Sequence, residues 1–423
     1  MARYAEYSVC NVEKLKLPTN PRILIIGGGY GGLKVAMGLQ KSVDFSSEKK
    51  PQITLISKHD YHYQTTLLHK VATGTLSARK ARIYYRKLLK QDKVMFIKDK
   101  IIKLEPENNC VYGNGGKYEY DVLVIALGFR PDDFNIPGVK KYSFKLSTLN
   151  VALKLRQHIE NKFKEFVHTK DPLDLHFIVC GTGFTSIEFA AELGSQFNEL
   201  CTICGIDNKI PKITCIGRNK QILPVFSENL SQKAVQKLEK MNIEIITNGD
   251  VKEVKKSSVV IEKDGKLQEL KANTILWGAG VKGSDIIEQS DIPNKKGKIE
   301  VGFQLRSLTH ANIFVVGDSA QPTTKDAIHA PTAQLSAQMG EFVAQMLGEM
   351  LKGKDFDSGF VFKHRGTVCS IGHTDGVGIV YGKELSGEFA AFMKNTIENR
   401  WLFSLGGFPL IFKKGQFRYR TSN

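Results

Sequence analysis

Short apolar runs that end in glycine recur along the chain, and each is followed by helical periodicity. The first run, at 22–26, leads directly into a glycine-rich turn at 27–32, and the second, at 175–180, leads into a similar turn at 181–186. Apolar runs of this length favour buried strands, and a spacing of three to four favours a helix. The pattern therefore predicts two strand–turn–helix units. The positions that carry the helical spacing are Leu33, Ala36 and Met37 after the first turn, and Ile187, Ala190, Ala191 and Gly194 after the second.

Three further apolar runs extend this organisation. Val122–Leu127 ends at Gly128, and Thr274–Trp277 ends at Gly278, at similar distances after their respective turns. We interpret these two runs as the closing strands of duplicated units. A third run, Asn312–Val316, leads into a Gly-Asp-Ser sequence. The repeated order of strands and helices predicts an α/β fold with two Rossmann-like domains.

The two turns have the residue types that bind phosphate. The first contains GxGxxG at Gly27, Gly29 and Gly32. In that motif the first glycine permits the tight turn, the second lets the backbone approach a pyrophosphate, and the third lets the helix pack close to the strand. The second turn has Gly181 and Gly183, with Ser186 in place of the third glycine. A purely structural glycine loop is an alternative for either turn alone, but both in this context predict two bound dinucleotides.

Asp318 distinguishes the two sites. A carboxylate just beyond a strand can accept hydrogen bonds from a polyol such as the ribityl chain of FAD, although an Asp there can also simply cap a helix. We assign FAD to the first turn on this basis. The predicted layout is a discontinuous FAD-binding domain at 22–146 and 297–353, an inserted NAD(P)H-binding domain at 147–296, a C-terminal region at 354–423 and an N-terminal extension at 1–21.

Composition and charge narrow the class of protein. Hydrophobic residues make up 42% and charged residues 24% of the 423 positions, which is typical of a globular chain and excludes a disordered or fibrous one. The formal net charge is +17, which favours anionic partners such as phosphate-bearing cofactors, acidic lipid or nucleic acid, or else serves solubility. No apolar run reaches the ~18 residues of a spanning helix, and residues 1–20 lack the apolar stretch of a signal peptide. We expect a cytoplasmic protein.

The cysteines predict neither a disulfide framework nor a metal site. The chain has seven, an odd number in a long chain without a secretion signal. Cys201 and Cys204 alone have CxxC spacing, and one such pair without further ligands is weak support for zinc. We expect these two cysteines to lie, reduced, in a surface loop.

The last 35 residues combine basic and aromatic side chains. Six basic residues stand against one acid, Glu398. This composition is typical of an interfacial anchor, in which apolar groups enter the head-group boundary while basic groups meet anionic lipid. Docking on the chain's own domain or on a homodimer partner is the alternative. The residues are Lys394, Arg400, Lys413, Lys414, Arg418 and Arg420, interleaved with Phe389, Phe392, Trp401, Leu402, Phe403, Phe408, Leu410, Ile411 and Phe412.

Several further motifs stand out along the chain. They are Tyr61-His62-Tyr63, 71–74, 183–188, 277–281, Ala333-Gln334 with Gln338, and 365–369. These motifs resemble those of the type II NADH dehydrogenases, the single-chain, non-pumping NADH:quinone oxidoreductases of respiratory electron transport, which belong to the two-dinucleotide flavoproteins. The resemblance covers nearly the whole chain and implies a peripheral membrane protein on the cytoplasmic face of the cell membrane, with FAD and NADH as cofactors and a menaquinone or ubiquinone as substrate.

The resemblance also implies site residues. Glu188, near the start of its helix, would relay a proton or gate access between the substrates, although an ordinary first-turn Glu is the alternative. Gln334 and Gln338 would face the quinone. FAD would contact Gly27, Gly28, Gly29, Tyr30, Gly31, Gly32, Ser57, Lys58, Ile101, Asp318, Ala333, Gln334 and Lys394. NAD(P)H would contact Gly181, Gly183, Phe184, Thr185, Gly217, Arg218 and Gly280. We expect a helix that begins at Pro331 and Thr332 and carries Ala333 and Gln334 in its first turn.

The chain departs from the family pattern in three places. Met339 replaces a glutamine that often follows Gln338 in the family, so we expect the quinone pocket to differ in detail. Ser57 replaces the acid that holds the ribose of FAD. In the nicotinamide unit the strand 213–216 continues into Gly217 and Arg218 with no acid at all. Because this removes repulsion against a 2′-phosphate, we predict that NADPH is accepted alongside NADH.

Other functions remain open at this point. A flavin disulfide reductase needs a cysteine after the second strand, and 58–76 has none. A sulfide:quinone reductase needs a cysteine pair near the flavin, for which Cys180 and Cys369 are unconvincing candidates. A soluble NAD(P)H oxidase that reduces oxygen is the first alternative. A non-enzymatic, redox-sensing flavoprotein is the second, although we find no nucleic-acid-binding motif and expect no such partner.

Overall fold

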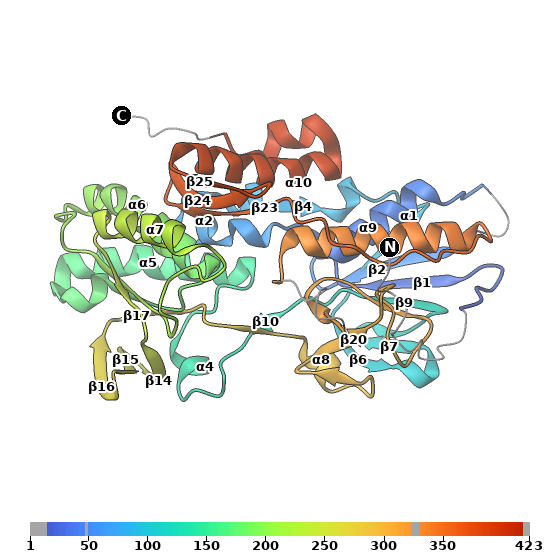
Figure 1. Ribbon diagram of the computed structural model, residues 1–423, viewed down its shortest axis with the longest axis horizontal. Helices are drawn as coiled ribbons and strands as arrows, with labels where there is room; N and C mark the ends of the chain where they lie inside the picture. Colours follow the sequence, from blue (N-terminus) through green and yellow to red (C-terminus); the bar gives the residue numbers. More distant parts are fainter. Residues whose placement is uncertain (1–14, 47–49, 324–329, 418–423) are drawn as a thin grey trace. The chain divides into compact units, whose positions relative to one another are not determined.

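A computed structural model describes residues 15–46, 50–323 and 330–417. The chain forms two compact units (Figure 1). Unit 1 comprises Met1–Tyr63, Ile83–Arg130 and Lys282–Lys363, and unit 2 comprises Gln64–Arg82, Pro131–Val281 and His364–Asn423. Much of the predicted N-terminal extension lies outside the described residues. The two units are defined by contacts within the chain, whereas the predicted domains are defined by the nucleotide that each binds. The predicted domain boundaries therefore stay predictions.

Unit 1 is built on a parallel sheet of five strands in the order β21-β9-β1-β2-β5. β1 pairs with β2 on one side and β9 on the other. These strands are almost wholly buried, as parallel strands covered on both faces should be. The elements are β1 (Arg22–Ile26), α1 (Tyr30–Ser42), β2 (Gln52–Ser57), β3 (Tyr61–Tyr63), β5 (Val94–Lys98), β6 (Ile101–Glu105), β7 (Cys110–Gly113), β8 (Gly116–Glu119), β9 (Val122–Ile125), α8 (Asp285–Glu288), β19 (Asn294–Lys295), β20 (Lys298–Val301), β21 (Ile313–Val315), β22 (Ala320–Pro322) and α9 (Ala333–Leu351), with 3-10 turns at Tyr85–Lys87, Pro106–Asn108 and Gly317–Ser319.

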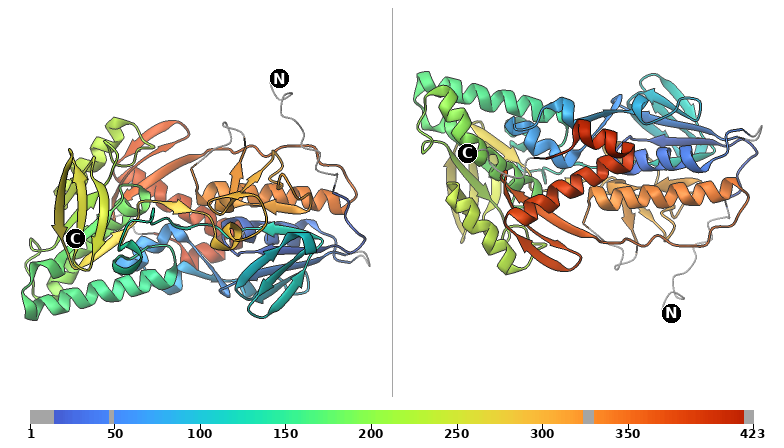
Figure 2. Two further views of the ribbon diagram at one scale, coloured as in Figure 1. Left: turned by 90° about the horizontal axis from the view of Figure 1, so that it is seen from below. Right: turned by 90° about the horizontal axis from the view of Figure 1, so that it is seen from above.

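Helices α1 and α9 of unit 1 lie side by side (Figure 2). Gly340 marks their closest approach, because a Cβ there would overlap the carbonyl oxygen of Gly31. Thr332 caps α9 by accepting a hydrogen bond of 3.1 Å from the Leu335 amide. The helix start predicted at Pro331 and Thr332 is therefore confirmed.

Unit 2 contains a second parallel sheet, in the order β13-β12-β11-β17. β17 pairs with β11 as β9 pairs with β1, which confirms the two closing strands of the duplicated units. The elements are α2 (Leu68–Thr73), α3 (Ala78–Ala81), α4 (Val139–Tyr142), α5 (Leu149–Thr169), β11 (His176–Cys180), α6 (Phe184–Cys204), β12 (Lys212–Ile216), α7 (Glu228–Lys240), β13 (Ile243–Ile246), β14 (Asp250–Lys255), β15 (Ser258–Lys263), β16 (Lys266–Lys271), β17 (Thr274–Trp277), β23 (Gly366–Ile371), β24 (Asp375–Val380), β25 (Lys383–Ser386) and α10 (Glu388–Lys414), with 3-10 turns at Thr65–Leu67 and Pro172–Leu175; β4 (Arg82–Tyr84), β10 (Arg130–Pro131) and β18 (Val281–Lys282) lie where the chain passes between the units.

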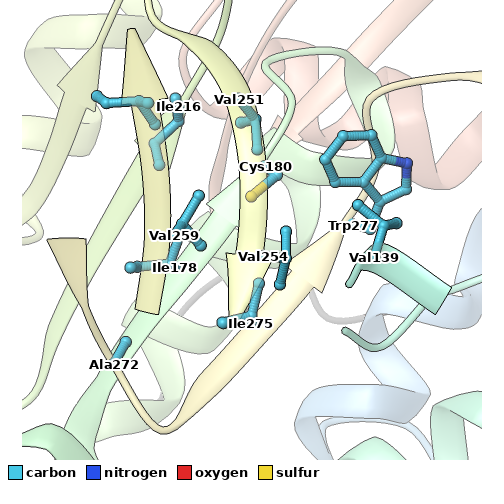
Figure 3. Close-up of a cluster of buried hydrophobic side chains, with 11 residues drawn as sticks. Val139, Ile178, Cys180, Ile216, Val251, Val254, Val259, Ala272, Ile275 and Trp277 are labelled. Atoms are coloured by element: carbon cyan, nitrogen blue, oxygen red, sulfur yellow. The ribbon is translucent and has the colours of Figure 1, made fainter. Parts of the chain in front are cut away.

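A hydrophobic core lies between the parallel sheet of unit 2 and the antiparallel sheet β14-β15-β16 (Figure 3). Ile178, Cys180 and Ile275 contribute from the parallel sheet, and Val254 and Val259 from the antiparallel one. This packing supports the end of β11, where the second glycine turn begins, and the end of the neighbouring β12.

The C-terminal part of unit 2 is a helix on a small sheet. α10 packs against β23 and β24 (Figure 1), and it bends at Gly406 and Gly407, where the backbone leaves the helical region. Both predicted glycine turns and both parallel sheets are present, so the α/β fold is confirmed. Among the described residues, no helix is long and apolar enough to cross a membrane.

Candidate functional site

The first glycine turn has one open glycine between two crowded ones. A Cβ at Gly27 would overlap the carbonyl oxygen of Ala126, and the backbone there has φ +100°. A Cβ at Gly32 would overlap the carbonyl oxygen of Gly27. Gly29, in contrast, has no heavy atom within 4 Å of its Cβ position, so a ligand can approach its backbone. This division matches the roles predicted for the three glycines.

Two side chains support the first glycine turn by contacting the carbonyl oxygen of Gly28. The Tyr85 hydroxyl donates a 2.7 Å hydrogen bond to the carbonyl oxygen of Gly28, and His62 Nδ1 lies 3.2 Å from the same oxygen. Burial lowers the pKa of His62 to about 4, so its ring is neutral at physiological pH and its Nδ1–H can donate. The His62 ring packs edge-on against Tyr30. Sequence reasoning identified the Tyr61–Tyr63 motif but missed Tyr85, which no local pattern marks.

The N-terminus of α1 suits an anion. Its N-cap, Gly29, makes no side-chain cap hydrogen bond, and its first turn contains no acid. The first-turn amides and the positive end of the helix dipole therefore face the space beside the open glycine. These features fit the pyrophosphate of a dinucleotide.

The remaining FAD residues predicted around β2 and β6 differ in exposure. Ser57, the last residue of β2, is partly buried, with its hydroxyl 3.5 Å from that of Tyr85. Lys58 follows and is exposed. Ile101 begins β6 and is 4% exposed, so its side chain belongs mainly to the core of unit 1.

Asp318 lies in the 3-10 turn that follows β21, where the sequence placed it. Burial raises the pKa of its carboxyl to about 6, with Lys298 and a hydrogen bond from Ser336 acting in the opposite direction. A carboxylate with too few donors around it gains from hydroxyl donors. Asp318 therefore fits a polyol ligand such as a ribityl chain.

The first turns of α9 hold the two glutamines predicted to bind quinone. Both side chains are partly exposed. The Gln338 amide is engaged by the backbone of Lys363, to which it donates and from which it accepts hydrogen bonds of 3.0 Å. Met339 is 1% exposed, and its sulfur accepts a hydrogen bond from the Gly317 amide, so this side chain points into unit 1. Gln338 Nε2 also lies 3.5 Å from Gln334 Oε1, to which it donates, so the two glutamine side chains are linked.

The second glycine turn repeats the geometry of the first in unit 2. Gly181 has φ +120° and lies against Gly278, while Gly183 has no heavy atom within 4 Å of its Cβ position. Gly183 is also the N-cap of α6 and makes no side-chain cap hydrogen bond. Ser186, which replaces the third glycine, is fully buried, and its hydroxyl fills the space that a side chain at Gly278 would need. Unit 2 thus holds a second turn whose geometry fits a phosphate group.

Three other predicted NAD(P)H residues surround this turn. Phe184 and Thr185 form the first turn of α6, and Thr185 is exposed. Gly280 lies under the ring of Phe134, which a Cβ would overlap.

Glu188 is the fifth residue of α6 and is 5% exposed. Lys394 Nζ lies 2.8 Å from its Oε1, and the Ser370 amide and hydroxyl donate hydrogen bonds of 3.1 and 3.2 Å to the same oxygen. Burial alone would raise the pKa of the Glu188 carboxyl, but Lys394, His69 and Ser370 outweigh it and hold the pKa below its usual value. Glu188 also raises the pKa of Lys394 against the effect of burial. The two groups form a buried ion pair in the second turn of α6, and a catalytic role for Glu188 stays a prediction.

Further ionisable groups of unit 2 surround this pair, and sequence reasoning missed them. His69 Nδ1 lies 3.8 Å from Glu188 Oε2. Glu398 is 3% exposed, with Lys70 Nζ 3.5 Å from one carboxylate oxygen and Lys394 Nζ 4.0 Å from the other. The sequence signal for this pair is the spacing of four between Lys394 and Glu398 on one helix.

Glu192 extends the buried cluster by one helical turn. It is 2% exposed, accepts a hydrogen bond from Thr75, and lies 3.4 Å from Nε2 of the partly exposed His373. Burial raises the pKa of Glu192, but the interaction with nearby His373 and the charge of Lys70 lower it to about 2. Its position four residues after Glu188 is the only sequence signal for it.

The expected surface loop at Cys201 and Cys204 is wrong. Cys201 and Cys204 lie in the last turn of α6, not in a loop, and Cys201 is 1% exposed. Both are free thiols, as are Cys180 and Cys369. No group of three or more His, Cys, Asp or Glu residues suited to a metal ion occurs in the described part of the chain.

The tail divides into a buried and an exposed face. Leu402 is fully buried and Lys394 is 9% exposed, so neither can contact lipid, contrary to the sequence expectation. Phe389, Phe403 and Phe412 are 46–79% exposed. Arg418 and Arg420 lie outside the described residues.

Comparison with known proteins adds to these observations. Residues 21–337 match the family described as pyridine nucleotide-disulphide oxidoreductase. A type II NADH:quinone oxidoreductase of Staphylococcus aureus is 39% identical over 400 residues, which cover 94% of this chain and 98% of that protein. The protein of the same name from Staphylococcus saprophyticus is 38% identical over the same shares.

Solved structures agree in fold. NDH2 from Plasmodium falciparum in complex with NADH matches with a TM-score of 0.82 and 21% identity, covering 93% of this chain and 97% of that one. The sulfide:quinone oxidoreductase of Aquifex aeolicus matches with a TM-score of 0.73 and 21% identity, covering 91% of each chain. At such identities the likeness shows the fold alone.

Proposed function

Because the chain belongs to the family of type II NADH:quinone oxidoreductases, we propose that it passes a hydride from NADH to bound FAD and two electrons onward to a quinone, without pumping protons. The observation that carries this proposal is the pair of glycine turns at Gly29 and Gly183. Each has an open glycine at the N-terminus of a helix beside a parallel sheet, which is the geometry that binds a dinucleotide pyrophosphate.

FAD, when bound, supplies a ring that accepts a hydride and releases electrons to a second acceptor. The turn 27–32 and the N-terminus of α1 would hold its pyrophosphate, and Asp318 its ribityl hydroxyls. Purified protein should therefore be yellow and release about one FAD per chain on denaturation. Colourless protein that does not take up added FAD would reject the proposal.

The pair of Glu188 and Lys394 is the proposed catalytic group. Glu188 keeps Lys394 protonated in a buried site, so that the pair can hold and pass on a proton during quinone reduction. Lys394 belongs to unit 2, whereas the other residues predicted to contact FAD belong to unit 1, so its contact with FAD stays a prediction.

Conservative variants separate catalysis from structure at this pair. Glu188→Gln keeps the size and the hydrogen-bond acceptor but removes the charge, and we expect kcat with a quinone to fall about tenfold or more. Glu188→Asp should restore part of the rate, and the pH dependence of kcat should change in Glu188→Gln. FAD content is the control for folding. Full turnover by Glu188→Gln would exclude a catalytic role.

Gln334 is the residue we propose to hydrogen-bond the quinone, with Gln338 as a second contact only if it gives up its bonds to Lys363. Gln334→Ala should raise the KM for a quinone analogue and leave the reduction of bound FAD by NADH unchanged. Gln338→Ala is the matched comparison on the same helix. An unchanged quinone KM in Gln334→Ala would reject this assignment.

We also propose that the exposed face of α10 rests on an anionic membrane surface on the cytoplasmic side. Phe403, Phe408 and Phe412 are exposed near basic Arg400 and Lys413. Removing all residues from 390 onward would also remove buried Lys394, so a triple change of the three phenylalanines to serine is the cleaner test. Retention on phosphatidylglycerol vesicles should fall sharply. Leu267→Ser, at a 70% exposed position in unit 2, is the control. Undiminished binding by the triple variant would reject the anchor.

The nature of the acceptor distinguishes the alternatives. A soluble oxidase would turn over with oxygen as fast as with a menaquinone analogue, and a redox-sensing protein would turn over with neither. We expect turnover with the quinone to exceed turnover with oxygen by about a hundredfold.

A further inference from the structure

The loop after β12 lacks the carboxylate that dinucleotide folds use to recognise NADH. In such folds an acid at the end of the second strand binds the 2′-hydroxyl of the adenosine ribose, whereas an arginine nearby accepts a 2′-phosphate. Here β12 ends at Ile216 and continues through Gly217, Arg218, Asn219 and Lys220. The residues that would face the ribose are therefore neutral or basic.

The fold allows no acid at Gly217. A Cβ there would overlap the side chain of Thr182, which belongs to the glycine turn itself. The backbone cannot shift to make room, because the Gly217 amide donates a 2.9 Å hydrogen bond to Ile246 and its carbonyl accepts one of 3.0 Å from Gly249. The missing carboxylate is thus a consequence of how this turn is packed.

Arg218 occupies the adjoining position with an exposed but supported side chain. Its guanidinium carbon lies 5.7 Å from the centroid of the Phe134 ring. Phe134 is itself held over Gly280 and packs edge-on against Trp277 at 6.5 Å. A ring on one side restricts the guanidinium, while the Arg218 side chain stays exposed and accessible to an anion. The cation is therefore partly preorganised for an anion.

Nearby acids are engaged elsewhere. After β13 the chain continues into β14, where Asp250 lies 2.8 Å from Lys252 Nζ. Glu262 on β15 lies 2.8 Å from the same ammonium group. Lys220, two residues after Arg218, is exposed and adds a second positive charge to the loop.

We propose that Arg218, assisted by Lys220, binds the 2′-phosphate of NADPH, so that NADPH is a reductant of this enzyme alongside NADH. The inference deepens the proposed function and rests on it. NADPH gives up a hydride and leaves as NADP⁺, and the quinone takes the two electrons and two protons, one of them from solvent. The phosphate does not react, and its role is to contribute binding energy through charge-assisted hydrogen bonds.

Steady-state kinetics of the holoenzyme with both donors test the proposal. In the wild-type protein kcat/KM for NADPH should lie within about a hundredfold of that for NADH. Arg218→Ala should lower kcat/KM for NADPH about tenfold more than it lowers kcat/KM for NADH, and Arg218→Lys should recover part of this selective loss. Lys209→Ala, which removes an exposed charge just before the opposite end of β12, is the matched control and should change neither value.

A binding measurement separates recognition from turnover. Adenosine 2′,5′-bisphosphate should bind the wild-type holoenzyme more tightly than 5′-AMP in calorimetry, and Arg218→Ala should remove most of that difference. Equal binding of the two nucleotides, or a wild-type preference for NADH above about a hundredfold, would overturn the inference. A protein that oxidises NADH but not NADPH fails this inference alone, whereas one that oxidises neither fails the proposed function.

Discussion

Removing Lys394 tests the buried charges of unit 2 quantitatively. We predict that Lys394→Met lowers the free energy of unfolding by about 3 kcal/mol, at the lower end of the cost of removing one partner of a buried pair. Glu188 and Lys394 are 5% and 9% exposed, so water cannot replace the lost ammonium group. The lower end applies because Ser370 still donates two hydrogen bonds to the remaining carboxylate.

The double variant Glu188→Gln/Lys394→Met removes both charges. Its loss should be smaller than the sum of the two single losses by about 2 kcal/mol, because neither charge is then left unpaired. Some loss of stability should remain in the double variant. Glu398 lies 4.0 Å from Lys394 and 3.5 Å from Lys70, so removing Lys394 leaves Lys70 as its partner of these two lysines.

The same substitution should change how stability depends on pH. In the wild-type protein the pKa of Glu188 is held below its usual value of 4.5, so its stabilising effect is present above that value and is lost as the pH falls through the lowered pKa. Without Lys394, burial becomes dominant and raises the pKa. A raised carboxyl pKa costs stability as the pH rises above 4.5, so the gap between wild type and variant should widen from about pH 4 towards neutrality.

Urea unfolding of the purified protein, followed by far-ultraviolet circular dichroism across this pH range, measures these effects. A loss below about 1 kcal/mol in Lys394→Met, or single losses that add within about 0.5 kcal/mol in the double variant, would show that the pair is not an energetically coupled, buried unit. A gap between wild type and variant that narrows with rising pH would contradict the assigned signs of the pKa shifts.

Three further predictions concern unit 1. Gly29→Ala should fold but bind FAD at least about tenfold more weakly, since its Cβ position is open to a ligand, whereas Gly27→Ala should fail to accumulate as folded protein; equal FAD affinity in wild type and Gly29→Ala, by fluorescence titration, would contradict this. Tyr85→Phe should cost about 1 kcal/mol in urea unfolding, because the carbonyl oxygen of Gly28 loses a 2.7 Å hydrogen bond; an unchanged midpoint would argue against that bond. Burial raises the pKa of Asp318 from its ordinary value of 3.8 to about 6, so the apo-protein loses stability as the pH rises through that range. Asp318→Asn should remove this pH-dependent loss and weaken FAD binding. A variant whose stability depends on pH as that of the wild type does would refute the assignment.

Local sequence determined the backbone framework. The apolar run at 22–26 coincides with β1, and the open and crowded glycines at Gly29 and Gly27 behave as their positions in GxGxxG require. Thr332 caps α9 where predicted. These features depend on strand periodicity, turn conformation and capping, which are properties of neighbouring residues and can therefore be deduced from sequence order alone.

Tertiary structure decided which charges are buried and paired. Lys394 looked like part of a basic tail, yet it forms a 2.8 Å ion pair with Glu188, a residue far earlier in the chain. Gln338 looked free for a ligand and is bonded to the backbone of Lys363. Whether an ionisable side chain is buried and paired depends on which distant segments the fold brings together. Because an unpaired buried charge is costly, each buried charge requires a partner of opposite charge from one of those segments. Sequence alone thus determined the two glycine turns, whereas only the folded chain decided the environment of each ionisable group.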